Sequence, residues 1–209
     1  MLNAGVLTFQ EFRVREKLPL AAIQDAVLEF LRGRDDAVLF GAQAVNAYVS
    51  EPRATEDIDL VSDHAAELSE ELRGYLGKRF HIAVRVRQVA QGRGYRLYQV
   101  RKAGNRHLVD LRPVEKLPAA QRVEQVLVAD PPELIASKVI AYHQRRGQPK
   151  SWTDRRDLAV LLLAFPGLKR ESGPVAERLQ AASAAPAALA VWKEIVAQKI
   201  QPPDEDGEF

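Results

Sequence analysis

Two aspartates one residue apart, Asp57 and Asp59, form the spacing that most clearly suggests chemistry. They lie in Thr55-Glu56-Asp57-Ile58-Asp59-Leu60, where acids alternate with apolar residues. Alternate side chains of a strand share a face, so Ile58 and Leu60 would enter a core while both carboxylates reach one opening. Two carboxylates this close repel each other unless a cation lies between them. The spacing therefore predicts a site for a hard divalent ion such as Mg²⁺, with Mn²⁺ as the substitute.

A third carboxylate, Asp110, lies on a second expected strand, residues 107–112. Val109 and Leu111 can face the core there, which turns Asp110 toward the acidic pair if the two strands are neighbours. Three carboxylates suit two ions about 3.5 to 4 Å apart, an arrangement that stabilises the attacking and leaving oxygens of phosphoryl transfer. We therefore interpret Asp57, Asp59 and Asp110 as metal ligands and catalytic residues.

A glycine turn upstream of the acids is a candidate phosphate site. Residues 38–40 are typical of a buried strand, which Gly41 ends before a helical pattern begins. The first N–H groups of a helix lack intrahelical partners and attract anions. We therefore predict nucleotide binding by the backbone of Gly41 and Ala42, with Gln43 as a further side-chain donor.

Lys138 is the second informative residue, because its neighbours at helical spacing are apolar: Leu134, Ile135, Ala141 and Tyr142. Either its stem packs while the ammonium reaches water, or the ammonium binds nucleotide phosphate as a point charge. Asp157, near the start of the next helix, can orient Lys138 or the substrate. The alternative for Asp157 is an ordinary acid favoured in the first turn of a helix.

The elements that position these residues follow from the hydrophobic period. A helix is expected over 18–31, strands over 38–40 and 57–61, a helix over 65–76, and alternating strands over 82–87, 95–100 and 107–112. Four helices are expected near 131–146, 153–165, 175–182 and 187–200, and Asp130 is expected to cap the first of them, with Pro131 at its first position. We predict an α/β domain at 1–117 with an N-terminal helix and a mixed sheet, a helical domain at 118–200, and a disordered acidic tail at 201–209.

Charge and composition limit the partners. The 209 residues include 30 basic and 28 acidic ones, a net charge of +2, yet residues 79–112 hold nine basic residues against one acid. This stretch indicates either a polyanionic partner or a solvated sheet face. With no cysteine and without a signal segment or an apolar run of roughly 18 residues, we expect a cytoplasmic protein without a membrane partner. The four histidines lack metal-ligand spacing, so we interpret them as surface or supporting residues: His64, His81, His107 and His143.

The order of strand, Gly41, helix and Thr55-Glu56-Asp57-Ile58-Asp59-Leu60 resembles the nucleotidyltransferase superfamily, which includes DNA polymerase beta and the antibiotic nucleotidyltransferases. The helix at residues 133–138, followed by Arg156-Asp157-Leu158, resembles its AbiEii/AbiGii toxin branch. The resemblance implies an α+β fold in which a mixed sheet flanked by helices precedes a C-terminal helical part. It further implies Mg²⁺-dependent transfer of an NMP from an NTP to a hydroxyl, with the first two acids holding metal and the third deprotonating the acceptor.

The toxin branch also implies an RNA acceptor, such as a tRNA 3′ end, and a cognate antitoxin protein. One departure is Ala42, since most superfamily members have serine or glycine there, so no hydroxyl is available for phosphate. Three alternatives stay open: a small-molecule acceptor of the antibiotic type, a degenerate member that binds nucleic acid or a protein partner, and a D-x-D glycosyltransferase. The last usually requires a larger nucleotide-binding sheet than this chain can supply.

Overall fold

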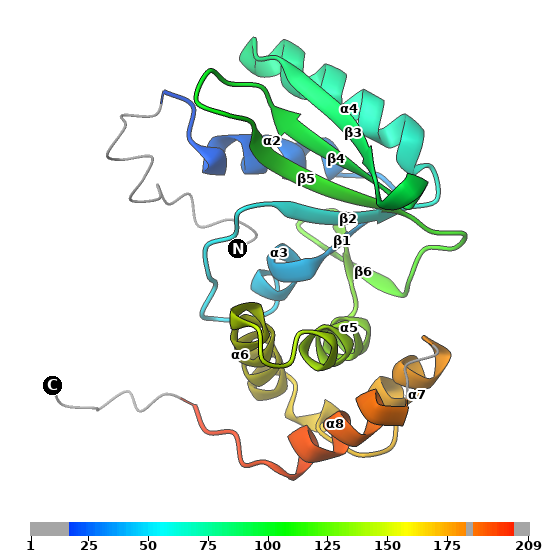
Figure 1. Cartoon of the computed structure of the whole chain (residues 1–209). Helices are drawn as coiled ribbons and strands as arrows, with labels where there is room; N and C mark the ends of the chain where they lie inside the picture. Colours follow the sequence, from blue (N-terminus) through cyan, green and yellow to red (C-terminus); the bar gives the residue numbers. More distant parts are fainter. Residues whose placement is uncertain (1–16, 183–185, 203–209) are drawn as a thin grey trace, which may run out of the picture. The chain divides into compact units, whose positions relative to one another are not determined.

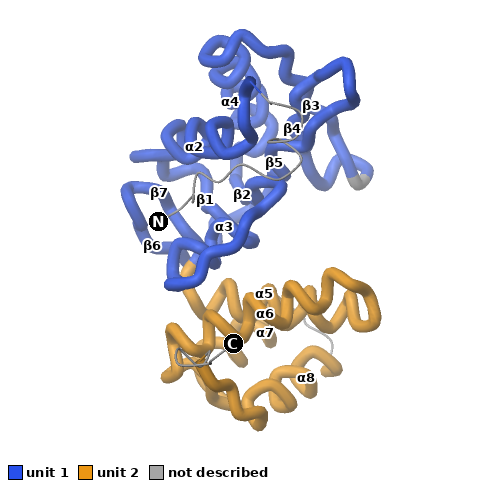
Figure 2. Tube along the Cα trace, turned by 90° about the vertical axis from the view of Figure 1, so that its left-hand side faces the viewer, with its two compact units in different colours: residues 1–129 blue, residues 130–209 orange. Residues whose placement is uncertain are grey.

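A computed structural model of the chain describes residues 17–182 and 186–202 (Figure 1). The chain forms two compact units, residues 1–129 and 130–209, hereafter unit 1 and unit 2 (Figure 2). Most of the predicted acidic tail, residues 203–209, lies outside the described residues. None of the helices in the described part of the chain is both long and apolar enough to cross a membrane.

Unit 1 is built on a seven-stranded mixed sheet of order β3-β4-β5-β2-β1-β7-β6. The strands are β1 (Ala37–Phe40), β2 (Ile58–Ser62), β3 (Val84–Val89), β4 (Gly94–Gln99), β5 (Arg106–Pro113), β6 (Ala120–Val123) and β7 (Val126–Ala129). β2 pairs with β5, and β1 with β7, in parallel, whereas the other neighbours are antiparallel. The predicted α+β class is therefore confirmed.

Two longer helices of unit 1, α2 (Leu20–Leu31) and α4 (Ala65–Phe80), pack on the sheet, and the short α3 (Gly41–Asn46) follows β1. α4 presents Leu68, Leu72 and Leu76 at a spacing of four residues, and all three are buried. The strand residues Leu97, Val109 and Leu111 are buried as well. This apolar layer fixes one face of β3, β4 and β5 against α4 (Figure 1), so the polar side chains of these strands lie on the other face.

The division between the units falls later than the sequence predicted. Residues after 117 were expected to be helical, but β6 and β7 form a hairpin that joins the sheet of unit 1. Its two-residue turn, Glu124 and Gln125, has positive φ at both positions, as a primed turn requires. Val128 pairs with Leu39 of β1, and both are fully buried. The boundary consequently lies between Ala129 and Asp130.

Unit 2 is helical, as predicted. Its helices are α5 (Pro131–Gln144), α6 (Pro149–Ala164), α7 (Pro174–Ala181) and α8 (Pro186–Ala197), with a 3₁₀ turn at Pro166–Leu168. α5 begins as the sequence indicated, because Asp130 caps it by accepting a hydrogen bond from the Glu133 N–H at 2.9 Å. α6 begins earlier than predicted, with Pro149 in its first turn. The core contains large buried side chains from α5, α6 and α8, such as Leu134, Leu161 and Trp192.

Candidate active site

The three predicted carboxylates come from two neighbouring strands. β2 and β5 are parallel partners, and their register places Asp59 directly beside Asp110. Asp57 lies one residue before β2, while Ile58 and Leu60 are fully buried. The alternation expected from the sequence is therefore present. We call the sheet face that carries Asp59 and Asp110 the site face.

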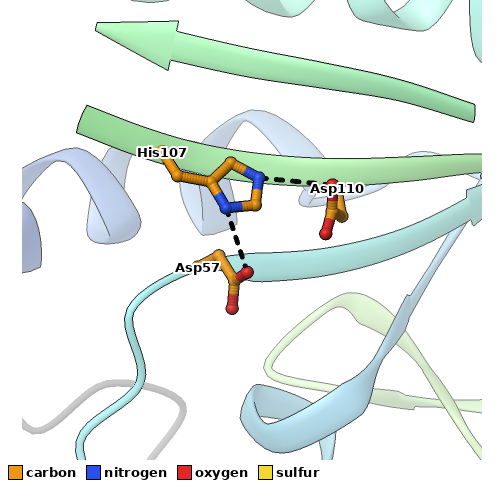
Figure 3. A group of neighbouring side chains, drawn as sticks. All are labelled: Asp57, His107 and Asp110. Atoms are coloured by element: carbon orange, nitrogen blue, oxygen red, sulfur yellow. Dashed lines mark ion pairs between the residues drawn. The ribbon is translucent and has the colours of Figure 1, made fainter. Parts of the chain in front are cut away.

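A histidine joins these acids for a reason that the sequence did not reveal. The pairing of β4 with β5 shifts by one residue between Leu97 and Tyr98, and consecutive residues Leu108 and Val109 are both buried. Such a bulge changes which face the residues before it occupy. His107 would otherwise share the core face with Val109, but here it lies on the site face between Asp57 and Asp110 (Figure 3).

His107 contacts one carboxylate with each ring nitrogen. Nδ1 lies 3.2 Å from Asp57 Oδ2, and Nε2 lies 3.2 Å from Asp110 Oδ1. The Asp110 carboxylate raises the pKa of His107 against the opposing effect of burial, and Asp57 adds to the increase. Both contacts favour the imidazolium form, which offsets part of the repulsion between the acids.

Asp110 is held by a second cation, Arg96 of β4. Arg96 is its cross-strand neighbour and donates from Nε to Asp110 Oδ1 at 2.6 Å. Burial alone would raise the pKa of Asp110, but His107 and Arg96 outweigh it, and the pKa is lowered. Asp110 therefore stays ionised and fixed in direction. Sequence reasoning placed Arg96 only in a basic stretch, because its partner depends on strand register.

The donor set fits a divalent ion. One ligand atom from each of Asp57, His107 and Asp110 lies within 4.8 Å of the other two, and all three residues are half-buried. The Nε2 atom of His107 is buried without a well-directed hydrogen bond. Carboxylate oxygens suit Mg²⁺ and Mn²⁺, and an imidazole nitrogen shifts the preference toward transition metals. His107 thus adds a nitrogen to the predicted oxygen ligands.

Asp59 is the acid closest to the glycine turn. Gly41 has φ of +65°, and a Cβ on it would lie 1.9 Å from Asp59 Oδ2. Glycine alone both adopts this positive φ readily and lacks the Cβ that would collide with Asp59. The close approach brings the first turn of α3, with Ala42, beside the acidic strand. Gln43, in contrast, is buried, and its Oε1 accepts from Asn46 Nδ2 at 3.5 Å, so its side chain packs inside while its backbone stays in that turn.

In unit 2, Lys138 belongs to a buried ion network between α5 and α6. Its ammonium donates to Asp157 Oδ2 at 2.7 Å and lies 3.4 Å from Asp154 Oδ1. Arg145 Nη1 donates to Asp154 Oδ2 at 2.8 Å. Lys138 is 8% exposed, and both aspartates are buried. The ammonium therefore does not snorkel to water, and it is held by Asp157 and Asp154.

Asp154 was missed by sequence reasoning, although a signal was present. Asp154 and Asp157 are three residues apart on one helix, which places both on the same side of α6. Two acids on a mostly buried side require a cation, and Lys138 is the buried lysine that supplies it.

Comparison with known proteins gives a family match over most of the chain. The model described as "Nucleotidyl transferase AbiEii toxin, Type IV TA system" matches residues 25–204. A search of curated proteins finds no match.

Among solved structures, the Megavirus polyadenylate synthase aligns with a TM-score of 0.60 at 12% identity, covering 75% of this chain and 34% of that protein. JHP933 from Helicobacter pylori aligns with a TM-score of 0.57 at 16% identity, covering 91% of this chain and 82% of that protein. A protein described as a "putative nucleotidyltransferase from H. pylori" aligns with a TM-score of 0.52 at 12% identity, covering 91% of this chain and 96% of that protein. The chain thus spans about a third of the viral enzyme, and at these identities the likeness concerns the fold.

Proposed function

Because the chain belongs to the nucleotidyl transferase AbiEii toxin family, we propose that it moves an NMP from an NTP to a hydroxyl acceptor and releases pyrophosphate. The observation that carries the proposal is the parallel register of β2 and β5, which puts Asp59 beside Asp110, with Asp57 one residue before β2. Family membership makes the chain a nucleotidyltransferase and argues against the glycosyltransferase alternative.

We assign the metal to Asp57 and Asp110, with His107 as an added nitrogen ligand, because ligand atoms of these three residues converge. Asp59, which does not belong to that converging group, is assigned as a further ligand because it pairs with Asp110 in the strand register. A bound Mg²⁺ or Mn²⁺ would supply positive charge that neutralises the triphosphate and stabilises the charge developing in phosphoryl transfer. Asp57 and Asp59 hold this position from one strand. The ligand set supports Mn²⁺ at least as well as Mg²⁺.

Asp110 is the proposed general base. It takes the proton of the acceptor hydroxyl while that oxygen bonds to the α-phosphorus, and the bond from the α-phosphorus to the bridging oxygen breaks to release pyrophosphate. The hydrogen bond from Arg96 keeps the carboxylate in one direction. The lowered pKa of Asp110 keeps the carboxylate ionised before the acceptor binds.

Phosphate binding is assigned to the backbone of Gly41, Ala42 and Gln43 and to Lys138. The N–H groups in the first turn of α3 support the first part, since they lack intrahelical partners. Lys138 is the proposed cation for the nucleotide phosphates, a role that requires its ammonium to exchange Asp157, to which it donates at 2.7 Å, for a phosphate oxygen. Ala42 supplies no hydroxyl, so the backbone must supply the contact there.

For the acceptor we favour RNA, such as a tRNA 3′ end, with a cognate antitoxin as the regulating partner and the cytoplasm as the location. The toxin family supports this choice. A small-molecule acceptor of the antibiotic type is the alternative, and the same experiment separates the two.

The test is incubation with each α-labelled NTP, in Mg²⁺ or Mn²⁺, with total cellular RNA or with a panel of aminoglycosides. We expect label in RNA that depends on the metal and is lost in Asp59→Asn. Asp63→Asn is the matched control, because Asp63 follows β2 but pairs with His64. Label in aminoglycosides alone would change the acceptor class. Absence of transfer from all NTPs to all acceptors would contradict catalysis.

A further inference from the structure

Arginines on the site face lead from the edge of the sheet to the carboxylates. Arg87 of β3 is opposite Arg96 of β4, which is opposite Asp110 of β5. Side chains paired across neighbouring strands lie on the same face. The adjacent row runs from Arg85 through Tyr98 to His107. Both rows therefore begin at β3, the edge strand, and end at the candidate site.

Arg85 and Arg87 have no acidic partner in the part of the chain that the structure describes. Both are exposed, and within the described part of the chain neither guanidinium has an ion pair or a hydrogen bond. Arg96, in contrast, is bound to Asp110. Two guanidinium groups two residues apart on one strand face repel each other, so an anion bound between them would relieve a cost present in the free protein.

The position of the pair suits a chain that ends at Asp110. Neighbouring strands lie about 4.8 Å apart, so β3 is roughly 10 Å from β5. α4 packs against the opposite face of these strands (Figure 1), which leaves the site face as the side from which an acceptor approaches the acids. Tyr98 lies between the arginines and the site, with its ring 5.2 Å from that of His107. A half-buried aromatic ring in this position can stack an unpaired base.

We propose that Arg85 and Arg87 bind the phosphate backbone of the single-stranded 3′ segment of an RNA acceptor and direct its terminal hydroxyl toward Asp110. The inference rests on the proposed function for the reaction at that hydroxyl. It adds the residues that bind the RNA acceptor and the direction in which its strand runs to the site. Single-stranded nucleic acids are typically bound by such a basic track with an aromatic platform.

The test is fluorescence anisotropy of a short labelled oligoribonucleotide with the full chain, measured across a salt series. Each phosphate contact on a single strand contributes about 0.7 to the slope of log affinity against log salt. The double variant Arg85→Gln, Arg87→Gln should therefore flatten the slope by about 1.4 and weaken binding on the order of tenfold at 0.1 M salt. The double lysine variant, which keeps both charges, should recover most of the affinity.

The matched control is Arg73→Gln, Lys78→Gln, which removes two positive charges from the exposed side of α4. This control should bind the oligonucleotide as the wild type does. If both double variants lost the same affinity for the oligonucleotide, net charge alone would explain the loss, and the inference would be overturned. A deoxyribonucleotide of the same sequence tests whether the backbone alone is sufficient, and weaker DNA binding would support contacts to the 2′-hydroxyl.

The two proposals can fail separately. If the wild type binds the oligonucleotide through Arg85 and Arg87 but transfers no NMP, the proposed function fails and this binding surface stands. If it transfers NMP only to small acceptors and the arginine substitutions change nothing, the surface is overturned while nucleotidyl transfer stands. Unfolding curves of each variant check that the fold is retained.

Discussion

The two units each hold a cluster of acids and cations. The clusters differ in how deeply they are buried and in how completely their carboxylates are paired with cations. In unit 1, Asp57, His107 and Asp110 are half-buried, and their ligand atoms converge on one point. In unit 2, Asp154 and Asp157 are buried and are bonded to Lys138 and Arg145. The same residue types thus form an open cluster in one unit and a closed one in the other.

From this difference we expect the cluster in unit 1 to govern activity and the cluster in unit 2 to govern stability. A buried charge that loses its partner is strongly destabilising, so the closed cluster should govern the folding of unit 2. The open cluster retains ligand capacity and like-charge repulsion, so it should govern chemistry and contribute little to folding. Substitutions at Asp59, Lys138 and His107 test this division, and a fourth at Glu133 concerns a half-buried acid outside both clusters.

The largest expected effect is the loss of catalysis in Asp59→Asn. Nucleotidyl transfer should fall about 10³-fold, the scale of losing a group that stabilises transition-state charge. The free energy of unfolding should change little, because the substitution removes one charge from a repelling set. Steady-state transfer assays and denaturant unfolding measure the two quantities. A variant that unfolds, or that keeps wild-type transfer, would contradict the assignment.

Lys138→Met should show the opposite pattern, a large loss of stability. The buried Asp157 loses its nearest cation, while Asp154 keeps Arg145, and an uncompensated buried carboxylate costs about 3 to 5 kcal/mol of unfolding free energy. Adding Asp157→Leu should recover part of that loss by removing one orphaned charge, and urea unfolding measures both variants. Transfer activity, assayed where the double variant is folded, then tests phosphate binding. Full transfer activity in the folded double variant would mean that Lys138 has a structural role only.

His107→Asn should separate the two metals. Losing a nitrogen ligand should weaken Mn²⁺ binding on the order of tenfold and Mg²⁺ binding less, since imidazole favours transition metals. Titration calorimetry of each ion reports this without any assay of activity. His64→Asn is the control, because His64 is exposed beside Asp63 and apart from the three ligands. Equal weakening of both ions would mean that His107 only positions the acids.

The smallest effect should come from Glu133, in the first turn of α5. Burial raises its pKa, so the folded state holds its proton more tightly than the unfolded state. The stability associated with that proton is present below the unfolded value near 4.5 and is lost as pH rises through the raised pKa. Glu133→Gln should therefore be more stable than wild type at neutral pH, with the difference vanishing in acid. Thermal unfolding of both proteins across that pH range measures the difference. No difference at neutral pH would mean that Arg178, 3.3 Å from Glu133, already compensates the buried charge.

Much of the fold and part of the site could be predicted from residue periodicity. The alternation around Asp59 and Asp110 is a local property of each strand, and the two-residue period defines it. β6 and β7 were missed because strands of four residues carry too few periods, and the apolar run at residues 126–129 has none.

The remaining site residues depend on contacts that a single strand or helix does not encode. Arg96 reaches Asp110 through the register of two strands, and Lys138 reaches Asp154 across two helices. His107 depends on one irregular step within β5. The two-residue period of a regular strand would place the His107 side chain in the core. The shifted pairing with β4 places it on the site face instead.

The bulge in β5 means that ligand identity here is a matter of spacing as much as of residue type. Asp110 keeps its place through its pairing with β2, while everything before Leu108 is displaced by one position. Inserting one residue between Leu97 and Tyr98 of β4 would give Leu108 a pairing partner and remove the bulge. His107 would then turn to the interior and leave an all-oxygen metal site without any change in the ligand residues. Two homologous proteins that both have this histidine and aspartate would then differ in metal preference through one inserted residue. Aligning such proteins by residue type alone would hide the change.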